Sequence, residues 1–291
     1  MPGTTQPNVY ISTFESIVRQ LAQQEISRLR PYVTERGTGA ENHNWERLGS
    51  TSAQQKTTRL QSTPENDPTW SRRVSVAQTW DVGTSTEQED PCQMLVDPNS
   101  NLAMSLGYAM RRAVDDQILL AATADALDGA GGTNALPAGQ IVGDYSTPIS
   151  FDAITAVQEV FMGNDIDMSI PKVAVVGPTQ VRKLMQLTEQ TSSDYVHAQA
   201  LQQLASTGIV PNWMGFTWVA STRLIIPTTD QIDCLFFTRR AIGLHVAQDI
   251  RAKIAEDPSN SFAWRIYCNM VMGAVRVEDE QLVWGKFADT L

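Results

Sequence analysis

A strand pattern runs directly into a helix pattern between Val173 and Gln180, an arrangement that can bind phosphate. The four residues from Val173 to Val176 are apolar and mostly β-branched, and Gly177-Pro178 opens the helix, whose first amides would face a ligand. The second glycine and the Lys-Ser/Thr pair of a phosphate loop are missing, and proline donates no amide hydrogen. We therefore interpret the segment as an ordinary turn. A soluble α/β enzyme with a nucleotide site near Gly177 is kept as an alternative hypothesis.

Other residues with ligand chemistry are few and dispersed. Asn164, Asp165 and Asp167 offer oxygen ligands for a divalent cation, but no glutamate follows at the spacing of a calcium-binding loop, so a turn is the simpler interpretation. The three histidines are far apart, and no serine or cysteine stands in a nucleophile motif. The sequence predicts no catalytic residue, no metal site and no cofactor. The histidines are His43, His197 and His245.

Composition narrows the class of protein. The chain has 291 residues, of which 42% are hydrophobic, enough to bury a core in one large or two smaller domains. A net charge of −10 argues against a dedicated nucleic-acid binder, which would carry a basic patch. No apolar run approaches the length of a membrane-spanning helix and the N-terminus lacks a signal-peptide pattern, so we expect no membrane contact. Cys92, Cys234 and Cys268 are widely spaced and are expected to be free thiols.

The longest helical pattern runs from Leu102 to Asp128. Apolar residues recur there at steps of three and four, which predicts one continuous buried stripe. Asp128-Gly129 is expected to end the helix. At 1.5 Å per residue, a helix of this length would be about 40 Å long, which suits a spine that spans the molecule. The stripe consists of Leu102, Leu106, Met110, Ala113, Val114, Ile118 and Ala121.

The segment before this helix reads as extended and polar. The spacing of apolar residues predicts a helix at residues 12–30, whereas residues 34–101 are rich in Thr, Ser, Gln and Asn. Within that polar region, apolar and polar residues alternate from Trp70 to Val82, the period of a half-buried strand. Residues 54–61 are its expected antiparallel partner, across a turn at 63–68. So polar a hairpin cannot form its own core, and we expect it to lie on another surface, such as a second chain.

The segment after the helix reads as compact α/β. It is predicted to contain a capped helix from Ser150 to Phe161, a strand from Lys172 to Val176 and a helix from Pro178 to Leu187. Residues 262–272 alternate as a strand, and Glu278 to Gln281 form a turn into the last strand. Trp213 lies between glycines and β-forming residues, as expected of an anchor in a core or at a subunit contact.

The order of several short motifs resembles tailed-phage major capsid proteins of the HK97-like fold family. The resemblance rests on Ser62-Thr63-Pro64, Arg72-Arg73, Glu89-Asp90, Asp97-Pro98, Arg112 with Asp115, the segment from Gly208 to Thr222, Ala241 to Leu244 and Gly273 to Val277. It extends over roughly residues 10–288 and implies an α+β fold with an N-terminal arm, an extended β-hairpin loop, a long spine helix, and peripheral and axial domains. The implied segments are the N-terminal arm at 1–47, the hairpin loop at 48–90, the peripheral domain with the spine helix at 91–149, the axial domain at 150–235 and the return to peripheral strands at 236–291.

The resemblance also implies a function and partners. The chain would assemble with copies of itself into pentamers and hexamers of an icosahedral virion shell that encloses phage double-stranded DNA without specific binding. A separate scaffold or decoration protein and a portal are possible partners. In the HK97 lineage a hairpin lysine forms a covalent bond with a neighbour, and Lys56 is the sole candidate here, although we interpret it as solvated. The candidate subunit-interface residues are Arg59, Trp70, Arg72, Arg73, Trp80 and Trp213. An encapsulin-like nanocompartment shell is the alternative within the same fold.

Overall fold

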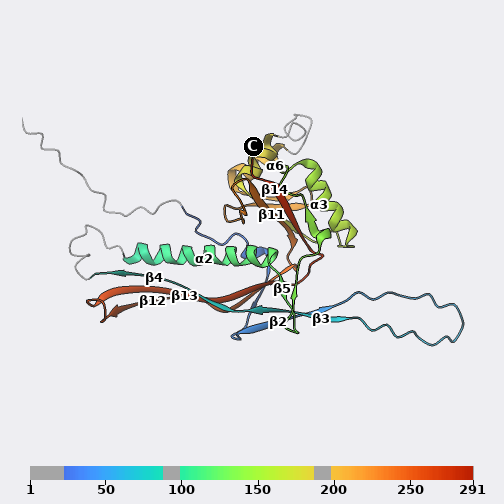
Figure 1. Ribbon diagram of the computed structural model, residues 1–291, viewed down its shortest axis with the longest axis horizontal. Coiled ribbons are helices and arrows are strands. Elements are labelled where there is room, and N and C mark those ends of the chain that lie inside the picture. Colours follow the sequence, from blue (N-terminus) through green and yellow to red (C-terminus); the bar gives the residue numbers. More distant parts are fainter. Residues whose placement is uncertain (1–22, 88–98, 187–197, 291) are drawn as a thin grey trace, which may run out of the picture.

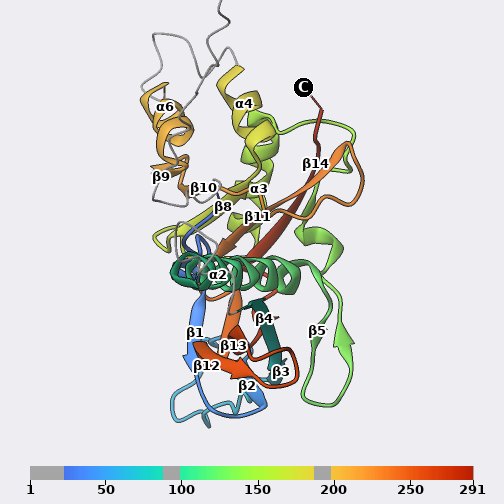
Figure 2. The same cartoon turned by 90° about the vertical axis from the view of Figure 1, so that its left-hand side faces the viewer.

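The computed structural model describes residues 23–87, 99–186 and 198–290, and these form two sheets joined by one long helix. Helix α2 (Asn99–Thr123) lies along an extended four-stranded sheet, and a second, compact sheet stands on its other side near the helix C-terminus (Figure 1). Viewed along the helix, α2 separates the two sheets (Figure 2). No helix in these ranges is long and apolar enough to cross a membrane.

The extended sheet is built mainly from two long antiparallel strands. Their pairing from Ile242 with Arg276 to Asp257 with Ala263 makes a hairpin that runs the length of α2 (Figure 1). A short parallel strand lines one edge and an antiparallel strand the other. The order across the sheet is β1 (Thr34–Gly37), β12 (Ile242–Asp257), β13 (Ala263–Arg276) and β4 (Gln78–Thr86).

The compact sheet has six strands, and helices α3 (Phe151–Gly163), α4 (Pro178–Gln186) and α6 (Ala198–Thr207) belong to the same body. The predicted strand at Lys172–Val176 is confirmed and is buried throughout, and Ser150 caps α3 by accepting a hydrogen bond from the Ala153 amide at 3.2 Å. The order across the sheet is β7 (Ile141–Val142), β14 (Leu282–Ala288), β11 (Gln231–Thr238), β8 (Lys172–Val176), β10 (Phe216–Ala220) and β9 (Ile209–Trp213).

Two small ribbons and two 3₁₀ turns complete the described elements. The β2–β3 ribbon belongs to the polar segment before α2, and the β5–β6 ribbon is the short hairpin after α2. The elements are η1 (Arg30–Tyr32), the β2 (Asn42–Leu48) and β3 (Trp70–Val76) pair, the β5 (Ala126–Leu127) and β6 (Thr133–Asn134) pair, and η2 (Ala138–Gln140).

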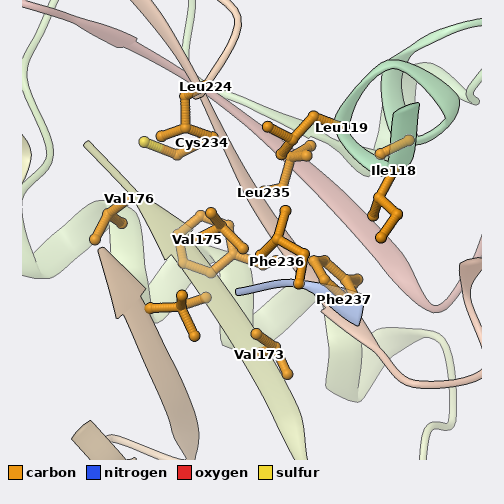
Figure 3. Packing of buried hydrophobic residues seen from close by; sticks show 14 of the residues in the cluster. Ile118, Leu119, Val173, Val175, Val176, Leu224, Cys234, Leu235, Phe236 and Phe237 are labelled. Carbon is orange, nitrogen blue, oxygen red and sulfur yellow. The ribbon is translucent and has the colours of Figure 1, made fainter. Parts of the chain in front are cut away.

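A single hydrophobic core connects both sheets through α2. Met110 and Val114 belong to the same buried cluster as Met270 of the extended sheet. On the compact side, Ile118 and Leu119 lie near Leu235 of β11 (Figure 3). From Met110 onward the predicted stripe is buried, except for Ala113, which is partly buried. The helix also buries a second side, containing Leu119 and Ala122, because it is enclosed by a sheet on each side.

The spine helix is shorter than the sequence predicted. It ends at Thr123 rather than at Asp128, because the Arg276 guanidinium donates hydrogen bonds to the carbonyl oxygens of Ala122 at 3.3 Å and Ala124 at 2.6 Å. Asp128 instead organises the turn between β5 and β6, where its Oδ1 accepts from the amides of Ala130 and Gly132.

The prediction of a helix at residues 12–30 is wrong for the part of that segment that the structure describes. Residues 23–29 are irregular and are followed by the short η1 turn, and residues 12–22 lie outside the described ranges. The cause is the buried Asp115 of α2, whose carboxylate accepts from Ser27 Oγ at 2.6 Å and from the amides of Arg28 and Leu29 at 3.0 and 3.1 Å. A side chain satisfies these amides in place of helical carbonyls.

The predicted hairpin has the wrong partner strand. β3 pairs with β2, from Asn42 opposite Val76 to Leu48 opposite Trp70, and residues 54–61 form no strand. The strand predicted from Trp70 to Val82 is divided at Ala77, after which β4 joins the extended sheet. The chain from 49 to 69 projects beyond the ribbon as an open loop (Figure 1). We call this loop the arm; it is distinct from the N-terminal arm expected at residues 1–47.

Candidate assembly surface at the base of the arm

The arm is exposed from Ser50 to Asp67. The ladder of the β2–β3 ribbon extends into it by one bond, from the Gly49 amide to the Thr69 carbonyl oxygen at 2.8 Å. Beyond that, a hydrogen bond from Asn66 Nδ2 to the Ser52 carbonyl oxygen joins its two limbs at 2.9 Å. Lys56 and Arg59 both lie in this exposed loop. A loop with so little cover in its own subunit has its surface available for a neighbour.

Arg72 and Arg73 lie on opposite faces of β3, as expected for adjacent strand residues. Arg72 is half-exposed, and its Nε donates to Glu46 Oε1 across the ribbon at 2.7 Å. Arg73 is only 6% exposed and donates to Asp279 Oδ2 at 2.7 Å. In β3 two polar residues are therefore buried and the apolar residues at its two ends are exposed, which is the reverse of the predicted alternation. Arg73 and Ser75 point inward because each has a polar partner within the subunit, whereas Trp70 and Val76 point outward.

Arg73 is part of an ionic network formed by Arg47, Arg73, Arg276, Glu278 and Asp279, which we call the arginine network; Arg73 and Arg276 are buried and the other three are partly buried. Asp279 accepts from Arg73 through Oδ2 and from the fully buried Arg276 through Oδ1, the latter at 2.6 Å. Arg47 lies 3.2 Å from Glu278 and 3.8 Å from Asp279. Buried charges are stable only when they are paired and hydrogen-bonded in this way.

The network joins distant parts of the sequence at one point. Besides capping α2, Arg276 donates to the Asn134 carbonyl oxygen at 2.7 Å, which fixes the β5–β6 ribbon. Arg73 and Arg47 belong to the two strands that carry the arm. The base of the arm is therefore bonded to the end of the spine helix and to the turn before β14, so the direction of the arm is set by the body of the subunit.

A second anchor lies beside the network. The Trp45 indole packs over Gly243 of β12, so closely that a Cβ on that glycine would lie 2.6 Å from the ring. Its Nε1 donates to Ser75 Oγ at 3.0 Å, and the ring of His43 meets it edge-on at 4.7 Å between centroids. Only glycine leaves room for this approach of the ribbon to the extended sheet.

The outer face of the ribbon is apolar at its arm end. Trp70 is 72% exposed, and Leu48, its cross-strand partner, is also exposed. A cavity of about 600 Å³ adjoins them, lined by Glu46, Arg47, Arg72, Arg73 and the turn after β5. An exposed tryptophan next to a charged hollow is typical of a contact surface.

The other two tryptophans of the predicted interface lie inside the subunit. Trp80 of β4 packs against the core opposite Met270, and Trp213 is only 2% exposed, with its ring 4.9 Å from that of Trp218. The core role that the sequence allowed for Trp213 is the one the geometry supports. The structure brings Trp70, Arg72 and Arg73 together at the base of the arm and leaves Arg59 in the arm itself.

The alternative chemistries have no support in the described residues. At the start of α4 the Gln180 side chain is buried, where it accepts from the Ile149 amide and donates to the Ala288 carbonyl oxygen, so the turn at Gly177 is filled. Asp167 caps a local turn by accepting from the Ser169 amide. No cluster of three or more metal-ligating residues occurs within residues 23–87, 99–186 and 198–290.

The histidines and cysteines add no reactive site. His43 and His245 lie together, with ring centroids 5.5 Å apart, which the sequence did not suggest, and His197 falls outside the described ranges. Cys234 and Cys268 are free, as predicted, and burial raises the pKa of both thiols. Cys92 also falls outside the described ranges.

Sequence reasoning missed Arg47, Arg276 and the role of Asp279. Residues 278–281 were interpreted only as a turn. The available signal was Arg276, a lone charge after the apolar residues of β13, because an arginine in a buried strand requires a carboxylate partner.

A long helix enclosed between an extended sheet and a compact sheet, with an arm projecting from the ribbon at its end, is the α+β HK97-like capsid fold. The structure matches the capsid of cyanophage P-SCSP1u over 97% of this chain and 94% of that one, with a TM-score of 0.73 and 15% identity. The capsid of Ralstonia phage GP4 matches over 99% and 98%, with a TM-score of 0.73 and 10% identity. The capsid of a native GTA particle, computed with C5 symmetry, matches over 97% and 96%, with a TM-score of 0.70 and 13% identity.

The chain belongs to the phage capsid protein family, which matches residues 7–289. It is therefore a major capsid protein, a structural component of an icosahedral virion shell and not an enzyme. Comparison with curated protein sequences found no match. The family favours the phage shell over the encapsulin-like alternative.

Proposed function

We propose that this chain forms pentamers and hexamers whose lattice encloses double-stranded DNA, and that the arm of each copy lies on a neighbouring copy. The observation that carries the proposal is an arm exposed from Ser50 to Asp67 yet fixed at its base by the arginine network. A rigid base with an uncovered arm is expected of an element whose binding surface belongs to another molecule. The fivefold symmetry of the similar GTA capsid supports pentamers.

We propose that the six-stranded sheet with α3, α4 and α6 is the axial domain and that α2 with the four-stranded sheet is the peripheral domain. The boundary expected between residues 235 and 236 falls inside β11, and β14 also belongs to the compact sheet. The axial domain therefore closes with strands from the end of the chain. Residues 1–47 and 48–90 remain the proposed N-terminal arm and hairpin region.

The charge of the chain suits a container for DNA. At −10 per copy, the shell does not depend on neutralising phosphates, and packaged DNA would be confined by walls and not by binding. A separate scaffold or decoration protein and a portal would complete assembly. Trp70, Arg72 and Arg59 are the proposed contacts to neighbours, whereas Arg73, Trp80 and Trp213 stabilise the subunit.

The test is assembly of the purified recombinant protein with and without the arm. Electron micrographs and sedimentation of the full chain should show shells of uniform size. A variant in which residues 52–66 are replaced by a short Gly-Ser connection should give folded subunits with an unchanged melting temperature and no shells. Normal shells from the armless variant would contradict the proposed role of the arm, and a full chain that stays monomeric under all conditions would contradict self-assembly.

A further inference from the structure

The far half of β12 has one strand neighbour where the near half has two. β13 pairs with β12 along its length, whereas β1 pairs only with Gly243 to Val246. The register of the β12–β13 pair shifts between Val246 and Arg251, just beyond the last residue that pairs with β1. Among the residues that the structure describes, no strand lies on the β1 side of residues 251–257.

This half of the strand also covers no core. All six residues from Arg251 to Glu256 are exposed, so neither face of the strand is packed within the subunit, and Ile254 at their centre is 55% exposed. An exposed edge is a template for pairing with another chain, and natural proteins cover such edges or protect them with charge. The charged residues on this edge include both signs, with the positive residues preceding the negative ones along the strand.

The charge pattern of residues 251–257 is self-complementary. Its first half carries Arg251 and Lys253, and its second half carries Glu256 and Asp257. In an antiparallel pair of two copies centred on Ile254, Arg251 of each copy faces Asp257 of the other, and the two Ile254 side chains meet. Opposite charges directly across a strand pair are stabilising. Moving the centre to Lys253 would instead place Asp257 against Asp249, which disfavours that register.

We propose that residues 251–257 of β12 pair antiparallel with the same residues of a second copy, so that the extended sheet continues across a two-fold axis. Such a contact is isologous, with the same patch on both subunits. The inference rests on the proposed shell, because the contact alone makes only a dimer and the lattice supplies the other contacts. It differs from the proposed arm contact, which involves another surface at the opposite end of the sheet (Figure 1).

Cross-linking of Ile254→Cys tests the contact directly. Residues opposite each other in an antiparallel pair have Cα atoms about 4.5–5.5 Å apart, within the range of a disulfide. Leu120→Cys on α2 is the matched control, since Leu120 is 53% exposed, and the native cysteines are common to both variants. After mild oxidation of assembled shells, a non-reducing gel should show a covalent dimer for Ile254→Cys and none for Leu120→Cys.

Intact Ile254→Cys shells without a covalent dimer would overturn the two-fold contact and leave the shell proposal standing. A wild-type chain that forms no shells would refute the shell proposal itself, so the two failures are distinguishable.

Charge exchange gives a second test that does not depend on cysteine chemistry. Within one chain Arg251 and Asp257 are about 20 Å apart, at 3.3 Å per residue, so they cannot pair with each other. Arg251→Asp and Asp257→Arg should each reduce the fraction of protein in shells, and the double variant should restore it, because the two copies then exchange signs. Asp257 also holds the β12–β13 turn of its own subunit, where it accepts from the Ser259 amide at 3.1 Å and from Asn260 Nδ2 at 2.9 Å and lies 3.7 Å from Arg265. Thermal melting of the subunits separates the loss of these local contacts from the loss of assembly. A double variant that assembles no better than the worse single variant would overturn the proposal.

Discussion

At the scale of single residues, Arg73 and Arg72 have opposite environments although they are adjacent in the chain. Replacing Arg73 with alanine should lower the free energy of unfolding of the subunit by about 3 kcal/mol, the lower end for breaking a buried pair, since Asp279 keeps Arg276. Arg72→Ala is the control, because exposed pairs contribute about 0–1 kcal/mol. Chemical denaturation of both variants measures the difference, and equal losses would contradict the structural role of Arg73.

Trp213 and Trp70 make a similar contrast among aromatic residues. Trp213→Ala should cost about 3–5 kcal/mol of subunit stability, because it removes a buried ring from the compact core. Trp70→Ala should leave the melting temperature of the subunit nearly unchanged and reduce shell formation. Calorimetry and sedimentation of the same two preparations test this. A stable Trp213→Ala subunit would show that its ring is not an anchor of the core.

His43 gives the subunit a dependence on pH. Its pKa is lowered by burial, by the nearby His245 and by Arg36, so the folded state favours the neutral ring. The unfolded chain then binds more protons, and stability is expected to fall as the pH drops below about 6.5, the ordinary pKa of histidine, until the lowered pKa is passed. His43→Gln should flatten this part of the melting-temperature profile between pH 7 and pH 5. An unchanged slope would exclude His43 as its source.

At the scale of elements, the segment before β1 is held by Asp115 and by the core. A chain that begins at residue 23 keeps Ser27, Leu29 and every contact to Asp115 described above, so it is the reference for a deeper truncation. Beginning at residue 31 removes the fully buried Leu29 and should cost about 2–5 kcal/mol. Thermal melts of the two truncations decide this, and equal melting temperatures would show that the Asp115 contacts contribute nothing.

Elements with local periodicity were predictable from the sequence, and those fixed by a distant side chain were not. The strand at Lys172–Val176, the helix capped by Ser150 and most of the spine follow from pattern and capping alone. The end of the spine depends on Arg276, which is more than 150 residues away. The irregular segment at 23–29 likewise depends on a carboxylate of α2. Neither cause can be recognised from the residues that are neighbours in the sequence.

The same distinction applies to the candidate site. The sequence shows the pair Arg72-Arg73, and strand alternation predicts that the two side chains lie on opposite faces. Which side chain would be buried depended on Asp279, and the partner strand of β3 depended on Trp45 and Gly243, all distant in sequence. Alternation alone favoured the apolar face as the buried one, and it was wrong in β3 because an ion pair reversed the preference.

At the scale of the whole molecule, the arginine network bonds the base of the arm to the end of the spine and to the turn before β14. Contacts at the two ends of the extended sheet, the arm at one end and the β12 edge at the other, would then fix the angle between neighbouring copies. Weak contacts repeated over a closed lattice give a stable shell.

Exchanging Glu46 and Arg72 tests whether the face beside the arm meets a neighbour. The two residues are cross-strand partners, so the double variant Glu46→Arg, Arg72→Glu keeps their attraction within the subunit and should preserve its melting temperature. A neighbour that binds Arg72 would instead meet a carboxylate, and like charges at a contact strongly disfavour it. We expect folded subunits that sediment as small species and show no shells in micrographs. The single variant Arg72→Glu controls for the local pair. Full-sized shells at normal yield from the exchanged variant would show that Arg72 does not contact a neighbouring subunit.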